Sequence, residues 1–343
     1  MVYSVNLATV RKAHQIWTTL FPAIKTYYAV KCCPDPMVVQ TLFRCGSAFD
    51  CASPAEVNLV FDEAPGADII YANPCKSPED MNYVFERGVR RTTFDSVCEI
   101  QKNLNVGFDL VLRIKADDPF ARCPMGNKFG AQEEEWDELA RTAQELGMPI
   151  VGVSFHVGSF AQTPNAYSEA IAKARRAFSK LEEYGHNPEL LDIGGGFSSK
   201  TILPASIEIN EAIKDYGFEN CELIAEPGRF MVEHAIDLYT TVIGVKKDSV
   251  TIDDSLYGAF NCIVMDHAKP TPRQLPGAVR KMTVFGCTCD GSDIIGHDID
   301  VSDKVKVGDS IVWSRMGAYT LAATTQFNGI PFHARERIYI DFC

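Results

Sequence analysis

The chain lacks an uninterrupted apolar run of about 18 residues, the length that a membrane-spanning helix needs, so we expect no membrane segment. Its start, Met1-Val2-Tyr3-Ser4, lacks the basic stretch and apolar core of a secretory signal, and we expect a cytoplasmic protein. Positive charge is scarce: 33 Lys and Arg stand against 45 Asp and Glu, for a net charge of −12. This balance disfavours nucleic acid as a partner and mildly favours a cationic small substrate.

Disulfide-framework spacing is also missing, although the chain has 12 cysteines. In a long chain without a visible signal, these residues are expected to be reduced thiols. Cys287 and Cys289 form a CxC pair, but no matching Cys or His pair stands at zinc-binding spacing. We therefore expect no metal site.

What the sequence does contain is an alternation of short apolar runs and amphipathic helical patterns over its first two-thirds. Helices are predicted over 133–146 and over 164–184, the second with Thr163 as N-cap and Pro164 in its first turn. Residues 200–206 are predicted as a surface loop. The predicted strands are 26–30, 47–50, 68–72, 90–94, 109–114, 149–155, 189–193 and 221–225.

Eight β-α repeats predict an α/β fold, a (β/α)8 TIM barrel. The pattern changes after about residue 235, where short strands separated by Gly, Asp and Pro turns predict a C-terminal mostly-β domain. The expected domains are the barrel at 7–235 and the β domain at 236–343, which also includes residues 1–6. The strands expected in the β domain are 242–245, 250–252, 281–285, 304–307 and 310–313.

Reactive side chains of such barrels lie at the carboxyl ends of the strands. Unusual residues follow or end six of the predicted strands: Lys31, Asp50, Arg113, His156, the run Gly194-Gly195-Gly196, and Glu226. A lysine at the tip of a buried strand loses solvation, which lowers its pKa and favours the neutral amine that a Schiff base needs. The alternative is a lysine that extends from a strand end to solvent.

The glycine run and the segment Glu226-Pro227-Gly228-Arg229 have the composition of an anion site. Glycine lets backbone N–H groups approach a phosphate, and a guanidinium pairs with it. A carboxylate such as Glu226 facing a pyridine nitrogen would keep that nitrogen protonated. The alternatives are a flexible turn at the glycines and a structural Glu–Arg salt bridge.

Other polar residues allow both functional and structural interpretations. His156 could stack on a flat cofactor and Ser159 could donate to a phosphate, or His156 could be structural. Ser53 and Glu56 have capping-box spacing, so part of the signal around Asp50 is structural. Lys128 could pair with these acids.

Taken in order, these segments resemble the eukaryotic and viral ornithine decarboxylase family, within the fold-type III pyridoxal-phosphate (PLP) decarboxylases of basic amino acids. The match covers nearly the whole chain. It rests on YAVKC (28–32), FDCAS (49–53), LRI (112–114), KFGA (128–131), SFHVGS (154–159), LDIGGGF (191–197), AEPGRF (225–230), DHA (266–268), CTCDG (287–291), GAYT (317–320) and FNG (327–329).

The resemblance implies pyridoxal 5'-phosphate as cofactor, attached to Lys31 as an internal aldimine. Catalytic roles are implied for Lys31, for Glu226 at the pyridine nitrogen, for His156 stacked on the ring, and for Cys289 as proton donor to Cα. Glu56 would help to shape the pocket. The implied cofactor-binding residues are Lys31, Asp50, Arg113, His156, Ser159, Gly194, Gly195, Gly196, Glu226, Pro227, Gly228, Arg229 and Tyr319.

Residues implied to contact the substrate, a small cationic amino acid, are Met265, Asp266, Asp290 and Phe327. Cys289 and Asp290 would reach into a partner's active site, which implies a homodimer with active sites shared across the interface. An antizyme partner has no readable motif here. Met265 departs from the aromatic residue of many members, and Cys33 departs from a common asparagine.

The expected reaction is decarboxylation of L-ornithine to putrescine and CO2, a step of polyamine biosynthesis. Arginine or lysine decarboxylation is the alternative, because arginine-preferring relatives of large algal viruses look similar except for a glutamate at the position of Asp266. A short aspartate suits a compact ammonium, whereas a guanidinium favours a planar bidentate partner. A catalytically dead, antizyme-inhibitor-like regulator is disfavoured because Lys31, Cys289 and the phosphate loops are present, and the order of the β-domain motifs disfavours a racemase.

Overall fold

A computed structural model describes residues 2–341 except 117, 119, 162–164 and 274–276. The chain divides into two compact units. The barrel unit comprises His14–Lys31 and Asp35–Phe230, and the β unit comprises the residues up to Ala13, Cys32–Pro34, and those from Met231 onward. The domain boundary after residue 235 stays a prediction.

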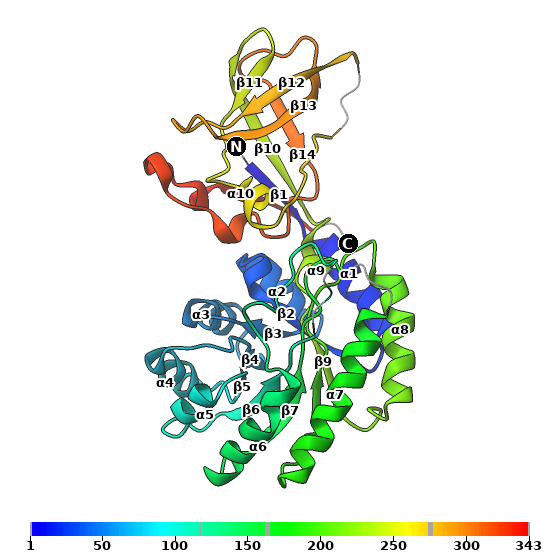
Figure 1. Ribbon diagram of the computed structural model, residues 1–343. Coiled ribbons are helices and arrows are strands. Elements are labelled where there is room, and N and C mark those ends of the chain that lie inside the picture. Colours follow the sequence, from blue (N-terminus) through cyan, green and yellow to red (C-terminus); the bar gives the residue numbers. More distant parts are fainter. Residues whose placement is uncertain (1, 117, 119, 162–164, 274–276, 342–343) are drawn as a thin grey trace. The chain divides into compact units, whose positions relative to one another are not determined.

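The barrel unit is built on a closed parallel barrel whose strands follow each other in chain order (Figure 1), as the sequence predicts. Apolar side chains from six of the strands form a layer inside it: Tyr27, Ala48, Ile70, Val111, Leu190 and Ile224. The strands are β2 (Lys25–Ala29), β3 (Ala48–Cys51), β4 (Ile69–Tyr71), β5 (Arg91–Phe94), β6 (Asp109–Arg113), β7 (Ile150–Ser154), β8 (Leu190–Asp192) and β9 (Glu222–Ala225).

Helices surround this barrel, and local sequence signals fix their starts. At α2, for example, the Asp35 side chain accepts hydrogen bonds from the N–H groups of Met37 and Val38, and Pro36 occupies the first turn. The helices are α1 (Leu7–Leu20), α2 (Pro36–Arg44), α3 (Pro54–Glu63), α4 (Pro78–Glu86), α5 (Val97–Asn103), α6 (Trp136–Glu145), α7 (Ala166–Glu183), α8 (Ile202–Asp215) and α9 (Arg229–Val232).

Two helix predictions and one loop prediction need comment. The helix predicted over 133–146 is a 3-10 turn, η2 (Glu133–Glu135), followed by α6. The predicted start at Thr163 and Pro164 lies outside the described residues, and α7 begins at Ala166. The loop predicted over 200–206 was wrong from Ile202 onward, because Ile202, Ala205 and Ile209 form a buried stripe at helical spacing in α8.

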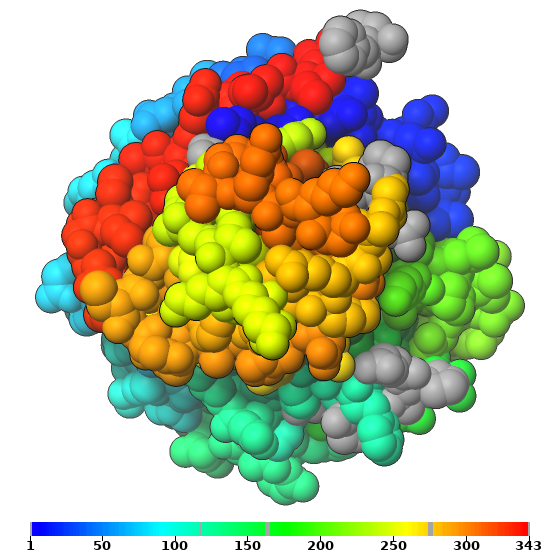
Figure 2. Space-filling model, turned by 90° about the horizontal axis from the view of Figure 1, so that it is seen from above, coloured from blue at the N-terminus to red at the C-terminus, as the bar shows by residue number. Residues whose placement is uncertain are grey.

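The β unit is built on a seven-stranded sheet in the order β13-β12-β11-β10-β1-β15, with β14 also paired to β10. Strand β1 (Val2–Asn6) runs antiparallel to β10 and parallel to β15. In Figure 2 the blue start of the chain accordingly comes to the surface beside the red C-terminal segment. The other strands are β10 (Ile236–Val245), β11 (Ser249–Ile252), β12 (Val279–Phe285), β13 (Ile294–Ser302), β14 (Ser310–Trp313) and β15 (Glu336–Ile340), and the short helical elements are α10 (Asn261–Met265), η3 (Leu321–Ala323), η4 (Phe327–Gly329) and η5 (Phe332–Ala334).

The strand predicted over 304–307 was wrong. Its Lys-Val-Lys-Val alternation lies in a turn, closed by a bond from the Lys306 N–H to Asp309 Oδ2 at 2.9 Å and one from the Gly308 N–H to the Val242 carbonyl at 2.9 Å. The structure instead has a strand that was not predicted, β13, which pairs with β12. The sequence conceals it because Asp298 has a φ of 55° and the register with β12 shifts after Met282.

Among the described residues, no helix is long and apolar enough to cross a membrane. Eleven cysteines in this part of the chain form no disulfide.

Candidate active site

Lys31 lies in the 3-10 turn η1 (Val30–Cys32), directly after β2. Its Nζ donates a hydrogen bond to Oδ2 of Asp50 on the neighbouring strand β3, and the Asp50 side chain is fully buried. The Lys31 side chain remains 35% exposed. The amine therefore lies at the carboxyl end of the barrel, where it is paired with a buried carboxylate and remains partly exposed to solvent.

Strand ends bring the other barrel residues of the predicted site to the same end. Arg113 is the last residue of β6, His156 follows β7, the three glycines follow β8, and Glu226 follows β9. In a closed parallel barrel the carboxyl ends of all strands lie on one face. The backbone thus places these residues at one end of the barrel.

The imidazole of His156 is neutral. Burial, and then the charges of Arg113 and Lys31, lower its pKa to about 3. The N–H of Gly158 donates to Nδ1 at 2.9 Å, which leaves the proton on Nε2. A neutral, fixed ring is suited to stacking on a flat cofactor.

The glycine run has no room for side chains. A Cβ on Gly194 would come 2.0 Å from the Phe155 carbonyl oxygen, and one on Gly196 would come 2.5 Å from that of Gly158. On Gly195 it would come 2.9 Å from Nε2 of His156. Gly194 and Gly196 also have φ values of +65° and +105°, which favour glycine.

Arg229 and Ser159 meet beside this run. The Arg229 guanidinium donates from Nη2 to Ser159 Oγ at 3.1 Å and lies 5.0 Å from the Phe160 ring centre. Ser159 in turn exchanges backbone hydrogen bonds with Cys123, at 3.1 and 3.3 Å. A guanidinium, a hydroxyl and a crowded glycine turn together make a site suited to a phosphate.

Some predicted barrel residues have structural partners. Ser53 Oγ accepts from the Glu56 N–H at 3.3 Å, and Glu56 Oε2 accepts from the Ala52 N–H at 2.7 Å, so both residues cap α3. Burial raises the pKa of Glu56. Lys128 lies 4.8 Å from the Phe129 ring centre.

Two residues near the glycine run were not predicted as site residues. The Tyr167 hydroxyl donates to the Gly195 carbonyl at 3.0 Å, and Asp192 Oδ1 accepts from the Gly194 N–H at 2.8 Å. Tyr167 lies within the helix predicted over 164–184, where its apolar neighbours at spacings of three and four indicate a buried helix face and no site. Asp192, a carboxylate at the end of an apolar strand, carried the same signal as Asp50.

The predicted substrate residues lie in the β unit. The Asp290 carboxylate accepts from the Tyr257 hydroxyl at 2.6 Å, and Tyr257 stacks on Phe327 with ring centres 4.1 Å apart. Cys289 is exposed, and its N–H donates to Oδ1 of Asn328 at 3.0 Å. The structure thus brings Tyr257, Asp290 and Phe327 together, and Tyr257 was not predicted.

The remaining three predicted residues also belong to the β unit. Asp266 directly follows α10 and is buried, whereas Met265 at the end of that helix is 70% exposed. Tyr319 has a φ of 57°, and its N–H donates to the Cys32 carbonyl at 2.8 Å. No group of three or more His, Cys, Asp or Glu side chains placed to hold a metal occurs in the described part of the chain.

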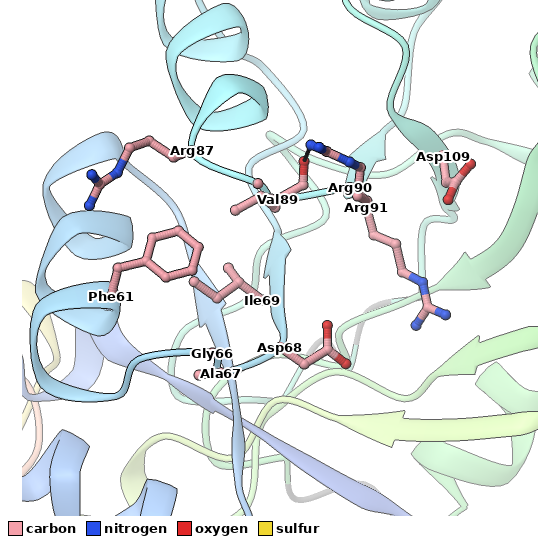
Figure 3. Close-up of a pocket in the computed structure, with 11 residues that line it drawn as sticks. Phe61, Gly66, Ala67, Asp68, Ile69, Arg87, Val89, Arg90, Arg91 and Asp109 are labelled. Carbon is pink, nitrogen blue, oxygen red and sulfur yellow. Dashed lines mark hydrogen bonds between the residues drawn. The ribbon is translucent and has the colours of Figure 1, made fainter.

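A separate pocket of about 490 Å³ lies at the opposite end of the barrel (Figure 3), where the segments 66–69 and 87–91 enter their strands. Two of its arginines have partners within the chain. Arg91 forms two 2.8 Å hydrogen bonds with Glu222, and Arg90 donates to the Phe85 and Val89 carbonyls. This pocket contains none of the predicted site residues.

The chain is similar to known proteins over almost its full length. Residues 7–233 match the family described as pyridoxal-dependent decarboxylase, pyridoxal binding domain. The chloroplastic ornithine decarboxylase of Nicotiana glauca is 39% identical over 95% of this chain and 81% of its own.

Two solved structures extend this comparison. The arginine decarboxylase of Paramecium bursaria Chlorella virus, bound to agmatine, has a TM-score of 0.93 and 36% identity, covering 99% of this chain and 95% of that one. The lysine/ornithine decarboxylase of Vibrio vulnificus, complexed with cadaverine, has a TM-score of 0.88 and 30% identity, covering 99% and 94%. The relatives thus share a fold and differ in the substrate that their names give.

Proposed function

Because this chain belongs to the fold-type III, PLP-dependent decarboxylases of basic amino acids, we propose that it converts L-ornithine to putrescine and CO2. PLP is its cofactor, and the barrel end fits that group. The observation that carries the proposal is the ion pair of Lys31 with the buried Asp50, set among a glycine turn, an arginine and a neutral histidine. When bound, PLP supplies an electron sink for the pair of electrons that CO2 leaves on Cα.

Each barrel residue has a defined task in this proposal. Lys31 attaches the cofactor through its amine, and Asp50 holds that amine in place. Arg229, Ser159 and the N–H groups of the glycine run bind the phosphate, as does Gly228, which precedes Arg229. Asp50 Oδ1 is buried and has no hydrogen-bond partner in the described chain, so a polar group of the ligand is needed there.

Further barrel residues bind the ring. His156 stacks on the ring as a neutral imidazole, and Glu226, preceding Pro227, binds the ring nitrogen. Arg113 adds positive charge beside them. From the β unit, Tyr319 contributes its hydroxyl to the phosphate.

Cys289 is proposed as the acid that returns a proton to Cα, because its thiol is exposed on a turn whose backbone is fixed by Asn328. Asp290 and Asp266 bind the distal ammonium of the substrate, with Phe327 and Met265 beside them. We infer a homodimer in which Cys289 and Asp290 serve the partner's site. Mixing the inactive variants Lys31→Ala and Cys289→Ala should then restore about a quarter of the activity, since half of the dimers carry one intact site.

The substrate is assigned from side-chain length. Asp266 and Asp290 are short carboxylates, which suit a compact ammonium better than a planar guanidinium. Since the relatives include arginine and lysine/ornithine decarboxylases, the test is kcat/KM on the three amino acids. A clear preference for arginine or lysine contradicts the assignment.

The reaction itself is tested by release of labelled CO2 from carboxyl-labelled ornithine. Borohydride reduction and peptide mapping should label Lys31. The Lys31→Ala variant should lose both signals, and Lys25→Ala, at the other end of β2, should keep both. A wild-type protein that releases no CO2 and stays colourless with PLP would indicate a regulator instead.

A further inference from the structure

Asp192 is a buried acid that the proposed reaction leaves without a task. It is the last residue of β8 and is fully buried. Its Oδ1 accepts from the Gly194 N–H at 2.8 Å, whereas Oδ2 has no donor in the described part of the chain. A buried carboxylate oxygen without a donor is costly, so this geometry needs an explanation.

The neighbour of Asp192 is Glu226. Strands β8 and β9 pair in parallel, with Asp192 opposite Ile224, and the Glu226 N–H donates to the Gly194 carbonyl at 2.7 Å. The negative charge of Asp192 is, after burial, the largest cause that raises the pKa of Glu226, as expected for two carboxyl groups brought close together by the paired strands. Two ionised carboxylates offer only acceptors, so Oδ2 of Asp192 can pair with Glu226 only if one of the two groups carries a proton.

The surrounding charges favour such a proton. Asp50 on β3 adds a third carboxyl group beside Asp192 and Glu226. The cations that act on this cluster of three carboxyl groups are Lys31 and Arg113. Burial raises the pKa of Asp192 to about 7. Burial first, and then the negative charges of Asp192 and Asp50, raise the pKa of Glu226 well above its ordinary value.

His156 adds no charge to this cluster, because its pKa is lowered to about 3. Three carboxyl groups and two cations are therefore balanced when one proton is shared between Asp192 and Glu226.

We propose that Asp192 and Glu226 share a single proton, and that Asp192 is a positioning residue that holds it when Glu226 binds the ring nitrogen of the cofactor. This inference rests on the role proposed for Glu226. An O–H donated from Asp192 to one Glu226 oxygen fixes the carboxylate and leaves its other oxygen, with the negative charge, for the N–H of the ring. Asp192 thus acts through Glu226.

Amide substitutions distinguish the two members of the pair. Asp192→Asn keeps an acceptor for the Gly194 N–H, offers an N–H to Glu226, and leaves the charge of the pair unchanged. Glu226→Gln also leaves one negative charge, but places it on Asp192, away from the ring nitrogen. We expect PLP affinity within about threefold of wild type for Asp192→Asn, and a loss of about tenfold or more for Glu226→Gln and for Asp192→Ala, which has no donor.

The shared proton can be seen without cofactor. Infrared spectra of the apoprotein at pH 8 should show the carbonyl stretch of a protonated carboxyl group in the difference between wild type and Asp192→Asn. Asp254, whose pKa is raised to about 7, is present in both proteins and cancels. Should Asp192→Asn fail to fold, the same band in wild type must persist at pH 8 and vanish in Glu226→Gln.

The proposal is overturned if the band is absent at pH 8, or if Asp192→Asn weakens PLP binding as much as Glu226→Gln does. The visible absorbance of bound PLP, recorded against pH, gives a second readout that a merely structural role would not move. It should match wild type in Asp192→Asn and differ in Glu226→Gln. If Lys31→Ala keeps the colour of bound PLP, the proposed function is contradicted. The infrared spectra of the apoprotein would still show whether Asp192 and Glu226 share a proton.

Discussion

Lys31 and Asp50 are joined by a direct hydrogen bond between Nζ and Oδ2, while the second oxygen of Asp50 has no partner in the described chain. In the proposed site, that second oxygen is left for the ligand. The Asp50 side chain is fully buried, so the loss of a partner is expected to leave a carboxylate oxygen unpaired.

Replacing Asp50 by Asn should therefore weaken PLP binding. Hydrogen bonds to charged groups contribute about 1.5–3 kcal/mol, so the dissociation constant measured by equilibrium dialysis should rise by about 10- to 100-fold. Asp68→Asn is the matched control, because Asp68 pairs at 3.2 Å with Lys25, the lysine at the other end of β2. Equal effects of the two substitutions would contradict the role of Asp50.

Replacing Gly196 by Ala should abolish PLP binding and destabilise the barrel unit. The new Cβ would come 2.5 Å from the Gly158 carbonyl and 2.9 Å from the Tyr167 hydroxyl, at a φ of +105°. Gly217→Ala is the control that separates backbone strain from steric collision, because Gly217 has a φ of +70° but no atom within 4 Å of the added Cβ. Urea unfolding should show a loss of about 1 kcal/mol for the control and a larger loss for Gly196→Ala.

Replacing Tyr257 by Phe should impair binding of the substrate ammonium. The Tyr257 hydroxyl, followed by the N–H and hydroxyl of Ser292, lowers the pKa of Asp290. Without the phenol that pKa rises toward its ordinary value, so fewer Asp290 side chains are ionised as the pH falls.

We expect KM for ornithine to rise by about 2- to 10-fold in Tyr257→Phe, with the larger increase at low pH, while kcat changes less. Tyr184→Phe removes a comparable Tyr–Asp bond, 2.9 Å to Asp137, from the barrel unit and should leave KM unchanged. A change in kcat alone would argue against a binding role for Asp290.

Replacing Asp254 by Asn should stabilise the protein above neutral pH. Burial raises the pKa of Asp254 to about 7, so the folded state holds a proton that the unfolded state releases at lower pH. Wild-type stability therefore falls as the pH rises from about 4 to about 7. Asn cannot ionise and still accepts from the N–H groups of Ser255 and Ala259.

The gain in unfolding free energy of Asp254→Asn over wild type should be about 2 kcal/mol larger at pH 8 than at pH 5, by urea titration at both values. Asp35→Asn is the control, since the buried Asp35 caps α2 through the N–H groups of Met37 and Val38. An equal gain at both pH values would mean that Asp254 is not protonated in the folded state.

The sequence predicted the barrel well because its strands are buried on both faces and read as continuous apolar runs between turn signals. The barrel residues of the predicted site followed from that order, since each strand delivers its last residue to one face. The β unit was harder to predict. Its strand β13 alternates weakly, and its partner strands are set by long-range pairing that local pattern does not encode.

The residues near the proposed site that the sequence did not predict have a similar explanation. Tyr167 lies in α7 at a position that also serves the apolar stripe, so its hydroxyl bond to the Gly195 carbonyl could not be read from spacing. Tyr257 acquires its role only because the turn carrying Asp290 folds back onto it. Asp192 was readable as a strand-end acid, but its coupling to Glu226 depends on the neighbouring strand.

The pairing of β1 has a consequence for biosynthesis. Residues 2–6 are synthesised before the barrel, yet their partners are β10, which ends at Val245, and β15, which ends at Ile340. All eight barrel strands are synthesised by Ala225, before either partner exists. The nascent chain therefore carries an unpaired strand edge throughout translation of the barrel, and the sheet of the β unit can close only after residue 336 has been synthesised.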